Sequence, residues 1–373
     1  MASSLSQTGR KRLNEFFVQM RKAYGVDDLT AEFNVSPTLE QKLEKKIQES
    51  SGFLQQISVH GVEELAGATV GMSFTGFIGK RTNTKAGHDR RAVDPHSLGQ
   101  REYYCNEAEY DLQIDWATVD MWAKFQDFYR KWQAGTTQQI ALNRIMVGFW
   151  GQYQATETTN AGYAAAGDPV FDMGQDFHEG WLQFIIRNAP DKVWGMNTDG
   201  SVDPIKVGPG GDFENMDALV FDLRHEVLPR AYRKAPNMVA MLGDKAYKAE
   251  VLRLYNANGD TASEKKPLDM YLQQYTFGRT PVADVPYFPE YGLLISPTAN
   301  LSYYYQTGSR RRSIEDNKHR KCVEDFQFIR EDFVVEDLDQ VAMVHPDALQ
   351  VPDGNGGWTG VAAADAWAVE IPA

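Results

Sequence analysis

Apolar and polar residues alternate along residues 103–116 with the two-residue period of a β-strand. One face carries Tyr104, Ala108, Tyr110, Leu112, Ile114 and Trp116, and the other carries Glu107, Glu109, Asp111, Gln113 and Asp115. Val70, Met72 and Phe74 alternate in the same way within residues 67–78. We therefore predict two long strands, each with one buried face. About 24 residues without an apolar pattern separate them, which is more than a hairpin turn requires.

A helical period follows in residues 118–150, where Trp122, Phe125, Tyr129 and Trp132 have a four-three spacing. This pattern predicts one long helix with Thr118 as its N-cap and Gly135 as its weak point. About 30 residues that rise 1.5 Å each would extend roughly 45 Å, so the helix would act as a spine. We expect an aromatic seam in which Trp122, Phe125 and Trp132 pack against Phe326, Phe328 and Phe333.

The remaining patterns predict a mixture of helices and strands, hence an α+β fold. Residues 10–24 form an amphipathic helix with a basic polar face, and Ser36 and Pro37 begin a second helix. Further helices are predicted at 176–188, 215–227 and 244–256, and strands at 237–242, 291–296 and within 322–345. The Gly- and Ala-rich tail after Pro346 is expected to be weakly ordered.

Composition narrows the class of protein. The 373 residues are enough for several packed subdomains, and 42 % hydrophobic residues exclude a disordered chain. The net charge of -13 disfavours a protein that coats nucleic acid over its whole surface. The two cysteines, Cys105 and Cys322, make no disulfide framework and no metal-binding pair. No apolar run is long enough to span a membrane, and the first residues lack the apolar core of a signal peptide.

Two basic clusters interrupt this acidic chain. The stretch "GFIGKRTNTKAGHDRR" (76–91) carries Lys80, Arg81, Lys85, Arg90 and Arg91. It is not a phosphate-binding P-loop, because a phenylalanine stands where the motif needs its first glycine and an arginine replaces the Ser or Thr. The second cluster, in "GSRRRSIEDN" (308–317), comprises Arg310, Arg311 and Arg312. We interpret it as a solvated or intersubunit turn in preference to a site for single-stranded nucleic acid, because acidic residues follow at once.

Catalytic motifs are missing from the sequence. None of the seven histidines forms H-x-x-x-H or H-E-x-x-H, and there is no G-x-S-x-G elbow. "NTDGSVD" (197–203) lacks the terminal Glu of a calcium loop and is more typical of a β-turn. We therefore predict no catalytic residue, no cofactor and no metal, and a protein that is not an enzyme.

Several long segments resemble the major capsid protein of P2-type tailed bacteriophages. They are "IQESSGFLQQIS" (47–58), "CNEAEYDLQIDWATVDMWAKFQDF" (105–128), "IKVGPGGDFENMDALVFD" (205–222), "VPYFPEYGLLISPTANLSYYYQTGSRRRSIEDN" (285–317) and "DFVVEDL" (332–338). The resemblance covers most of the chain from about residue 30 to 345. It does not extend to the tail after Pro346 or to the details of 152–175.

The resemblance implies the HK97-type capsid fold. Its parts would be an N-terminal assembly segment (1–33), an N-arm (34–66), an E-loop hairpin (67–116), a peripheral domain with the spine helix (117–175), an axial domain (176–317), returning peripheral strands (318–345) and a tail (346–373). The family's N-terminal segment acts inside the precursor shell and is often trimmed by a separate protease. Residues 1–25 carry five Lys or Arg against Glu15, whereas residues 26–50 carry six acids against three lysines.

The implied function is a shell protein that forms hexamers and pentamers of an icosahedral capsid around double-stranded DNA. Implied partners are further copies of the chain, an internal scaffold or prohead protease, a portal, and the packaged DNA through weak non-specific contacts, with no membrane. The protein would belong to the virion capsid and be assembled in the host bacterial cytoplasm. The two basic clusters would make contacts between subunits. An encapsulin-like compartment holding cargo enzyme is the alternative on the same fold.

Overall fold

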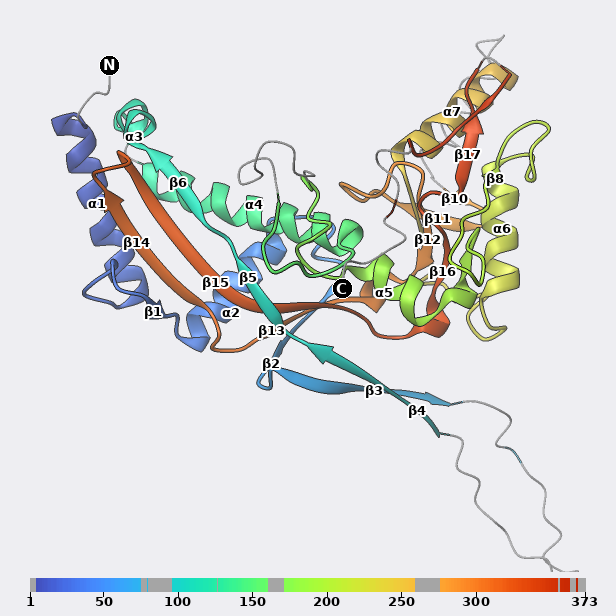
Figure 1. Ribbon diagram of the computed structural model, residues 1–373, viewed down its shortest axis with the longest axis horizontal. Helices are drawn as coiled ribbons and strands as arrows, with labels where there is room; N and C mark the ends of the chain where they lie inside the picture. The colour runs from blue at the N-terminus through green and yellow to red at the C-terminus, as the bar shows by residue number, and fades with distance from the viewer. Residues whose placement is uncertain are drawn as a thin grey trace, which may run out of the picture.

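The computed structural model describes residues 5–74, 79, 96–125, 127–159, 171–258, 276–354, 356–362 and 367. Figure 1 shows an elongated molecule with a sheet and helices at one end, a second lobe at the other, and the hairpin of β3 (Ala66–Phe74) and β4 (His96–Tyr104) projecting away from both. Helices and strands are mixed along the chain, as the sequence patterns predicted.

A seven-stranded sheet organises the end of the molecule that holds the N-terminus. Its strands are β1 (Phe33–Asn34), β2 (Ser58–Val62), β5 (Asn106–Glu109), β6 (Leu112–Asp115), β13 (Leu301–Gln306), β14 (Arg311–Asn317) and β15 (Cys322–Val335). The order is β1-β14-β15-β13-β2, and β5 and β6 also pair with β15. The long strand β15 is therefore the common partner of four others.

The projecting hairpin consists of β3 (Ala66–Phe74) and β4 (His96–Tyr104), which are antiparallel with Ala66 opposite Tyr104 and Phe74 opposite His96. The second predicted strand is thus divided, because Cys105 ends β4 and the chain then joins the main sheet as β5 and β6. Within β5 and β6 the predicted alternation is confirmed, since Ala108 is buried while Glu107 and Glu109 are exposed. Tyr104 departs from it and is exposed.

The predicted spine is two helices, α3 (Trp116–Trp122) and α4 (Phe128–Trp150), and Asp115 is the N-cap instead of Thr118. The predicted aromatic seam is wrong, because Trp122 is 38 % exposed and Phe125 is 50 % exposed. Of the expected partners, Phe326 is itself 40 % exposed and Phe333 packs against Trp181. Helix α1 (Gln7–Tyr24) packs against the start of α4, with the ring of Phe16 centred 5.9 Å from that of Phe128.

The main hydrophobic core lies where α4 meets α5 (Trp181–Asn188) and β15. Trp181 is fully buried, and its ring packs edge-on against Phe149, Phe333 and Phe53 at centroid distances of 5.1, 5.4 and 6.3 Å. Gly148 permits this approach, because a Cβ at that position would overlap the Trp181 ring. Phe333 therefore packs against Trp181, whereas the predicted seam assigned it to the aromatic side chains of residues 122–132.

The second lobe contains a six-stranded sheet in the order β10-β11-β9-β12-β16-β7 and a three-stranded sheet in the order β18-β17-β8. The strands of these sheets are β7 (Val193–Trp194), β8 (Ile205–Lys206), β9 (Val239–Leu242), β10 (Thr276–Phe277), β11 (Thr280–Ala283), β12 (Leu293–Ser296), β16 (Ala342–Val344), β17 (Leu349–Pro352) and β18 (Trp358–Thr359). The lobe also contains the helices α6 (Met216–Val227) and α7 (Asp244–Asn258). Three short 3₁₀ helices lie in the connecting segments: η2 (Pro190–Lys192), η3 (Thr298–Asn300) and η4 (Leu338–Gln340). The predicted helices near α6 and α7 and the strands near β9 and β12 are confirmed. The helix predicted at 176–188 begins only at Trp181.

The described part of the tail after Pro346 packs on the rest of the molecule. Strand β17 pairs with β8, and Trp367 is buried with its ring stacked on Trp150. The indole N–H of Trp367 donates a hydrogen bond to Gln183 at 2.7 Å. Glycine and alanine content predicted weak order, whereas strand β17 and Trp367 hold the described part of the tail against the rest of the molecule.

Candidate assembly site at the base of the projecting hairpin

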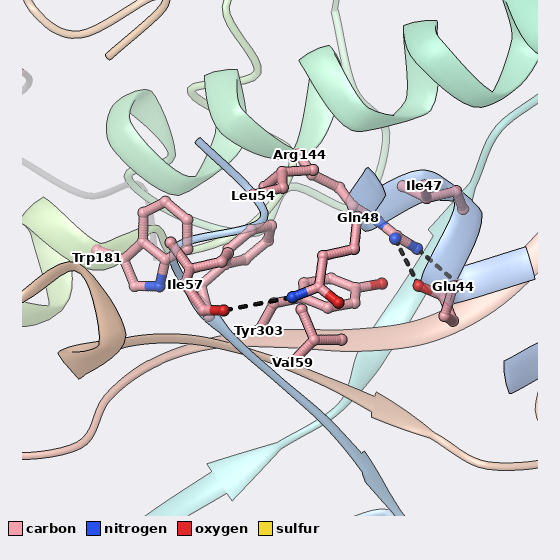
Figure 2. A pocket seen from close by; sticks show the side chains of 10 residues that line it. Glu44, Ile47, Gln48, Leu54, Ile57, Val59, Arg144, Trp181 and Tyr303 are labelled. Atoms are coloured by element: carbon pink, nitrogen blue, oxygen red, sulfur yellow. Dashed lines mark hydrogen bonds and ion pairs between the residues drawn. The ribbon is translucent and has the colours of Figure 1, made fainter. Parts of the chain in front are cut away.

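Five elements meet where the projecting hairpin joins the molecule: α2 (Pro37–Glu49), α4, β5, β13 and β15. A fully buried group of charges links them. Figure 2 shows Arg144 reaching from α4 toward Glu44 on α2. Their side chains form a two-pronged ion pair, with Nη1 2.6 Å from Oε2 and Nη2 3.2 Å from Oε1. Arg310, between β13 and β14, also pairs with Glu44.

Arg144 also extends the network to β15. Its Nε lies 3.5 Å from Oε2 of Glu331, and its guanidinium lies 4.1 Å from the ring centre of Tyr303. The hydroxyl groups of Tyr110 and Tyr303 each donate a hydrogen bond of 2.5 Å to Glu331. Arg144 and Arg310 thus pair with the carboxylates of Glu44 and Glu331 in a region closed to solvent. A third buried carboxylate, Glu40, accepts a hydrogen bond of 2.6 Å from the N–H of Gly308.

Burial and charge act in opposite directions on these groups. Burial alone would raise the pKa of Glu44, but Arg144 and Arg310 hold it below its usual range. Burial and the neighbouring Glu331 together hold the pKa of Tyr110 well above its usual range. Burial likewise raises the pKa of Tyr303 well above its usual range. The network therefore stays ionised at Glu44 and protonated at both tyrosines, which fixes the direction of its hydrogen bonds.

The network leaves no room for a ligand. The cavity beside it, lined by Glu44, Gln48, Arg144, Trp181 and Tyr303 among others, measures about 10 Å³. That is about the least volume in which one water molecule fits. Gln48 closes it by donating a hydrogen bond of 3.4 Å to the carbonyl of Ile57. The network consequently serves to hold α2, α4 and β15 together.

A second polar cluster fastens the root of the hairpin. The backbone N–H of Tyr104 donates to Asp332 at 2.9 Å, and the Asn106 amide lies 3.0 Å from Nε2 of His178. His178 is buried outside any helix, whereas the sequence predicted a helix over residues 176–188. Its Nε2 lies 3.7 Å from Asp332, and the neighbouring Glu179 pairs with Arg187 at 2.7 Å. Burial raises the pKa of Glu179 to about 7.

The structure places the second basic cluster, predicted to contact other subunits, largely inside its own subunit. Arg310 is buried against Glu44, and Arg312 is buried against Asp325. Arg311 is 49 % exposed and lies 3.8 Å from Glu32. The first cluster, Lys80, Arg81, Lys85, Arg90 and Arg91, lies outside the described residues.

Two groups of acidic residues are candidate partners for the first basic cluster on a neighbouring subunit: Glu107, Glu109 and Asp111, and Glu331, Asp332, Glu336 and Asp337. Glu331, Asp332, Glu336 and Asp337 are engaged within the subunit, by Tyr110 and Tyr303, by Tyr104 N–H, by Tyr304 and by Tyr232 respectively. Glu107, Glu109 and Asp111 instead face solvent along β5 and its end, where Glu107 pairs with Arg330 at 2.9 Å. These three carboxylates are therefore on an outer surface of the subunit.

Sequence reasoning missed the buried network altogether. One weak signal was present, because Arg144 interrupts the apolar run that ends α4, "IALNRIMVGFW". An arginine in such a run must either reach solvent or meet a buried acid. Its partner lies 100 residues away on α2, so no local pattern identifies it.

Residues with ligand-binding chemistry do not gather elsewhere in the described ranges. No three His, Cys, Asp or Glu side chains of that part of the chain are placed to hold a metal ion. The segment 197–203 forms a turn, in which the N–H of Gly200 donates to the carbonyl of Asn197. Cys105 and Cys322 are free and buried, and burial raises the pKa of Cys105 to about 12. Over the same ranges, no helix is long and apolar enough to cross a bilayer.

The whole fold is similar to that of a protein from a phage procapsid. The chain superimposes on a protein in the structure of the satellite phage P4 procapsid including size determination (Sid) protein. The TM-score is 0.72 and the sequence identity 30 %, covering 93 % of this chain and 99 % of that one. The fold is thus that of a phage capsid subunit.

Sequence comparison identifies the family. Residues 12–346 match the model of the phage major capsid protein, P2 family, and the chain belongs to this family. It is 33 % identical over 339 residues to the capsid protein of Escherichia phage P2, covering 89 % of this chain and 92 % of that one. It is 31 % identical over 331 residues to the major capsid protein of Serratia phage KSP20, covering 88 % and 92 %.

The function is accordingly that of a major capsid protein of a tailed phage, a structural protein of the virion that associates with copies of itself. The encapsulin-like alternative is less supported, because the family model and both relatives are phage capsid proteins.

Proposed function

We propose that copies of this chain form the hexamers and pentamers of an icosahedral shell that encloses double-stranded DNA. The family match over residues 12–346 carries this proposal. Negative-stain microscopy of the purified protein tests it, and closed shells are the expected result. A stable monomer or dimer under all assembly conditions would contradict it. Nucleic acid extracted from shells purified from infected cells would distinguish a capsid from a compartment that holds enzyme.

The parts of the fold receive corresponding roles in this proposal. The hairpin β3–β4 with β5 and β6 is the E-loop, α2 and β2 belong to the N-arm, and α4 is the spine of the peripheral domain. The second lobe, with β7 to β12 and β16, is the axial domain, and residues 346–373 are the tail. The boundary expected at residue 317 shifts, because β13 and β14 lie in the seven-stranded sheet of the peripheral domain, whereas β16 lies in the second lobe. The HK97-type subdivision is supported by the projecting hairpin and by β15, which joins the E-loop root to the main sheet.

The basic stretch 76–91 docks on a neighbouring subunit in this proposal. Glu107, Glu109 and Asp111 are the receivers that remain exposed, whereas Glu331 is buried. Each exposed ion pair contributes about 0–1 kcal/mol, but a closed shell repeats the contact in every subunit.

Reversal of Arg81, Arg90 and Arg91 to Glu tests the docking. We expect a folded subunit that assembles poorly, and wild-type association that weakens at high salt. The matched control reverses Lys234, Lys248 and Lys318, which are exposed elsewhere and change the net charge equally. Normal shell yield and salt resistance in the first variant would show that the loop is merely solvated.

Residues 1–33 serve assembly and are then trimmed in this proposal. The charge change between residues 1–25 and 26–50 supports it, because a basic helix is attracted to an acidic shell lining. An internal scaffold, a prohead protease and a portal would take part during assembly in the host cytoplasm. Mass spectrometry of mature particles tests the trimming, and a uniformly intact start at Met1 or Ala2 would contradict it.

A further inference from the structure

The N-terminal segment is not a loose arm. Residues 5–29, which we name the strap, pack into the subunit through Leu13, Phe16, Met20 and Leu29, all of which are buried. Together they supply half of the fully buried side chains in one hydrophobic cluster. The other half comes from α3, α4, β14 and β15: Val119, Phe128, Ile314 and Val323. The strap therefore covers an apolar face that the rest of the chain cannot cover alone.

Polar contacts join both ends of the strap to carboxylates and to a backbone N–H of the body. Ser6 donates from its backbone N–H and its hydroxyl to Asp120, the hydroxyl at 2.7 Å. Arg10 pairs with Asp316, and the N–H of Ile314 donates to the carbonyl of Leu29 at 2.7 Å. Without the strap, these two carboxylates and this strand N–H would lose partners at the rim of an apolar surface.

The covered face continues into a groove that is already open. The groove holds about 430 Å³ between β6, α3 and α4 and is lined in part by Ile114, Trp122, Phe128 and Trp132. Ile114, Phe128 and Trp132 also belong to the cluster beneath the strap. The indole N–H of Trp132 is buried and has no acceptor among the described residues. Met121 and Phe125 are exposed nearby.

We propose that the strap is a displaceable cover over a contact surface for a second copy of this chain. This inference rests on the proposed trimming of residues 1–33. A capsid subunit is surrounded mainly by other copies of itself, which makes a second copy the occupant. An apolar face of this kind, rimmed by Asp120 and Asp316, has the character of a protein interface. Trimming would join it to the open groove and so create one continuous surface.

A cleavable full-length chain tests the inference apart from natural trimming. A site for a specific protease is inserted between Thr30 and Ala31, which are both exposed. Amide hydrogen exchange at Ile314 is then measured in uncut subunits, cut subunits and shells of cut chains. We expect protection in the first, loss of protection in the second, and recovery in the third, because a neighbour replaces the strap.

A competition experiment with a peptide tests whether the face beneath the strap is the surface that binds a second copy. A peptide of residues 1–29 in excess should suppress the self-association of cut subunits, whereas the same peptide with Leu13, Phe16 and Met20 changed to Ser should not. A strap that stays bound after cutting, or an Ile314 amide that remains unprotected in shells of cut chains, would overturn the inference. Association that the first peptide leaves unchanged would also overturn it, because another surface would then be responsible. Intact N-termini in natural particles would contradict only the trimming.

Discussion

The buried charge network makes a sharp prediction about stability. Replacing Arg144 with Met removes the guanidinium that joins α2, α4 and β15 but leaves an apolar side chain of similar length. Arg310 would still pair with Glu44, but buried Glu331 would lose the guanidinium that lies 3.5 Å from it, so one buried carboxylate would lack a balancing charge. Removing one partner of a buried ion pair costs about 3–5 kcal/mol. An independent figure agrees, since two unit charges 4 Å apart interact by about 4 kcal/mol at an effective dielectric constant of 20.

The measurement is the free energy of unfolding of the unassembled subunit, followed by tryptophan fluorescence in urea. The control is Lys45→Met, which removes a cation from the same helix as Glu44. Lys45 pairs with Glu49 at 3.8 Å, but both are exposed, so we expect a loss of about 0–1 kcal/mol. A loss below about 1 kcal/mol for Arg144→Met, indistinguishable from the control, would refute the structural role of the network.

A double variant separates lost charge balance from lost packing. Glu44→Gln with Arg144→Met removes both charges of the pair, so the coupling between Glu44 and Arg144 is lost only once in the double variant. We therefore expect the double variant to be more stable than the sum of the two single losses predicts, by about 1–3 kcal/mol. Strict additivity would show that the two groups are not coupled, despite the 2.6 Å that separates their nearest atoms.

Three further predictions concern pH and packing. Burial raises the pKa of Glu179 to about 7, so its contribution to stability is full below about pH 4.5 and falls as the pH rises to 7. Glu179→Gln should therefore be more stable than wild type at pH 8 by roughly 1–3 kcal/mol and equal to it near pH 4, which urea unfolding at each pH would measure. Burial lowers the pKa of His345 to about 4, so its contribution to stability is full above pH 6.5 and falls as the pH drops to 4. The melting temperature of His345→Gln should therefore fall less than that of wild type between pH 6.5 and 4, and an equal fall in both proteins would contradict the prediction. Trp181→Ala should cost about 3–5 kcal/mol and give insoluble protein, whereas Trp122→Ala should change the stability of the isolated subunit by less than about 1 kcal/mol; equal losses would contradict the burial of one and the exposure of the other.

The spacing of apolar residues correctly predicted the helices and strands whose buried face is set by contacts close in the sequence. Strands β5 and β6 alternate because one face lies on the body while the other carries Glu107 and Glu109 into solvent. Helix α6 lies close to its predicted range because its N-cap is local: the Asn215 side chain accepts a hydrogen bond from the N–H of Ala218. In both cases the decisive contacts lie within a few residues or within one strand pair.

Features set by distant partners could not be predicted in this way. Phe128 and Trp132 of the apolar stripe join a cluster with α1, which lies about 100 residues earlier in the chain, and the expected partner Phe333 packs against Trp181. Trp122 and Phe125 instead lie beside Lys131, whose ammonium is 4.6 Å from the Phe125 ring centre. The burial of Arg310 depends equally on a distant residue, Glu44, so an exposed basic turn was the natural interpretation of the sequence.

The strap and the network differ in what trimming would do to them. Every residue of the strap precedes residue 33, whereas Glu44, Arg144, Arg310 and Glu331 all follow it. On the proposed trimming, a subunit would therefore lose half of one hydrophobic cluster and keep the whole network that ties α2 to α4 and β15. Ionic contacts of this kind need specific geometry, so they hold elements in register while an apolar surface changes its partner. Arg144→Met should consequently impair cut and uncut shells to the same degree, because α2 contributes no residue to the cluster that the strap completes and Ile47 packs into the main core in both.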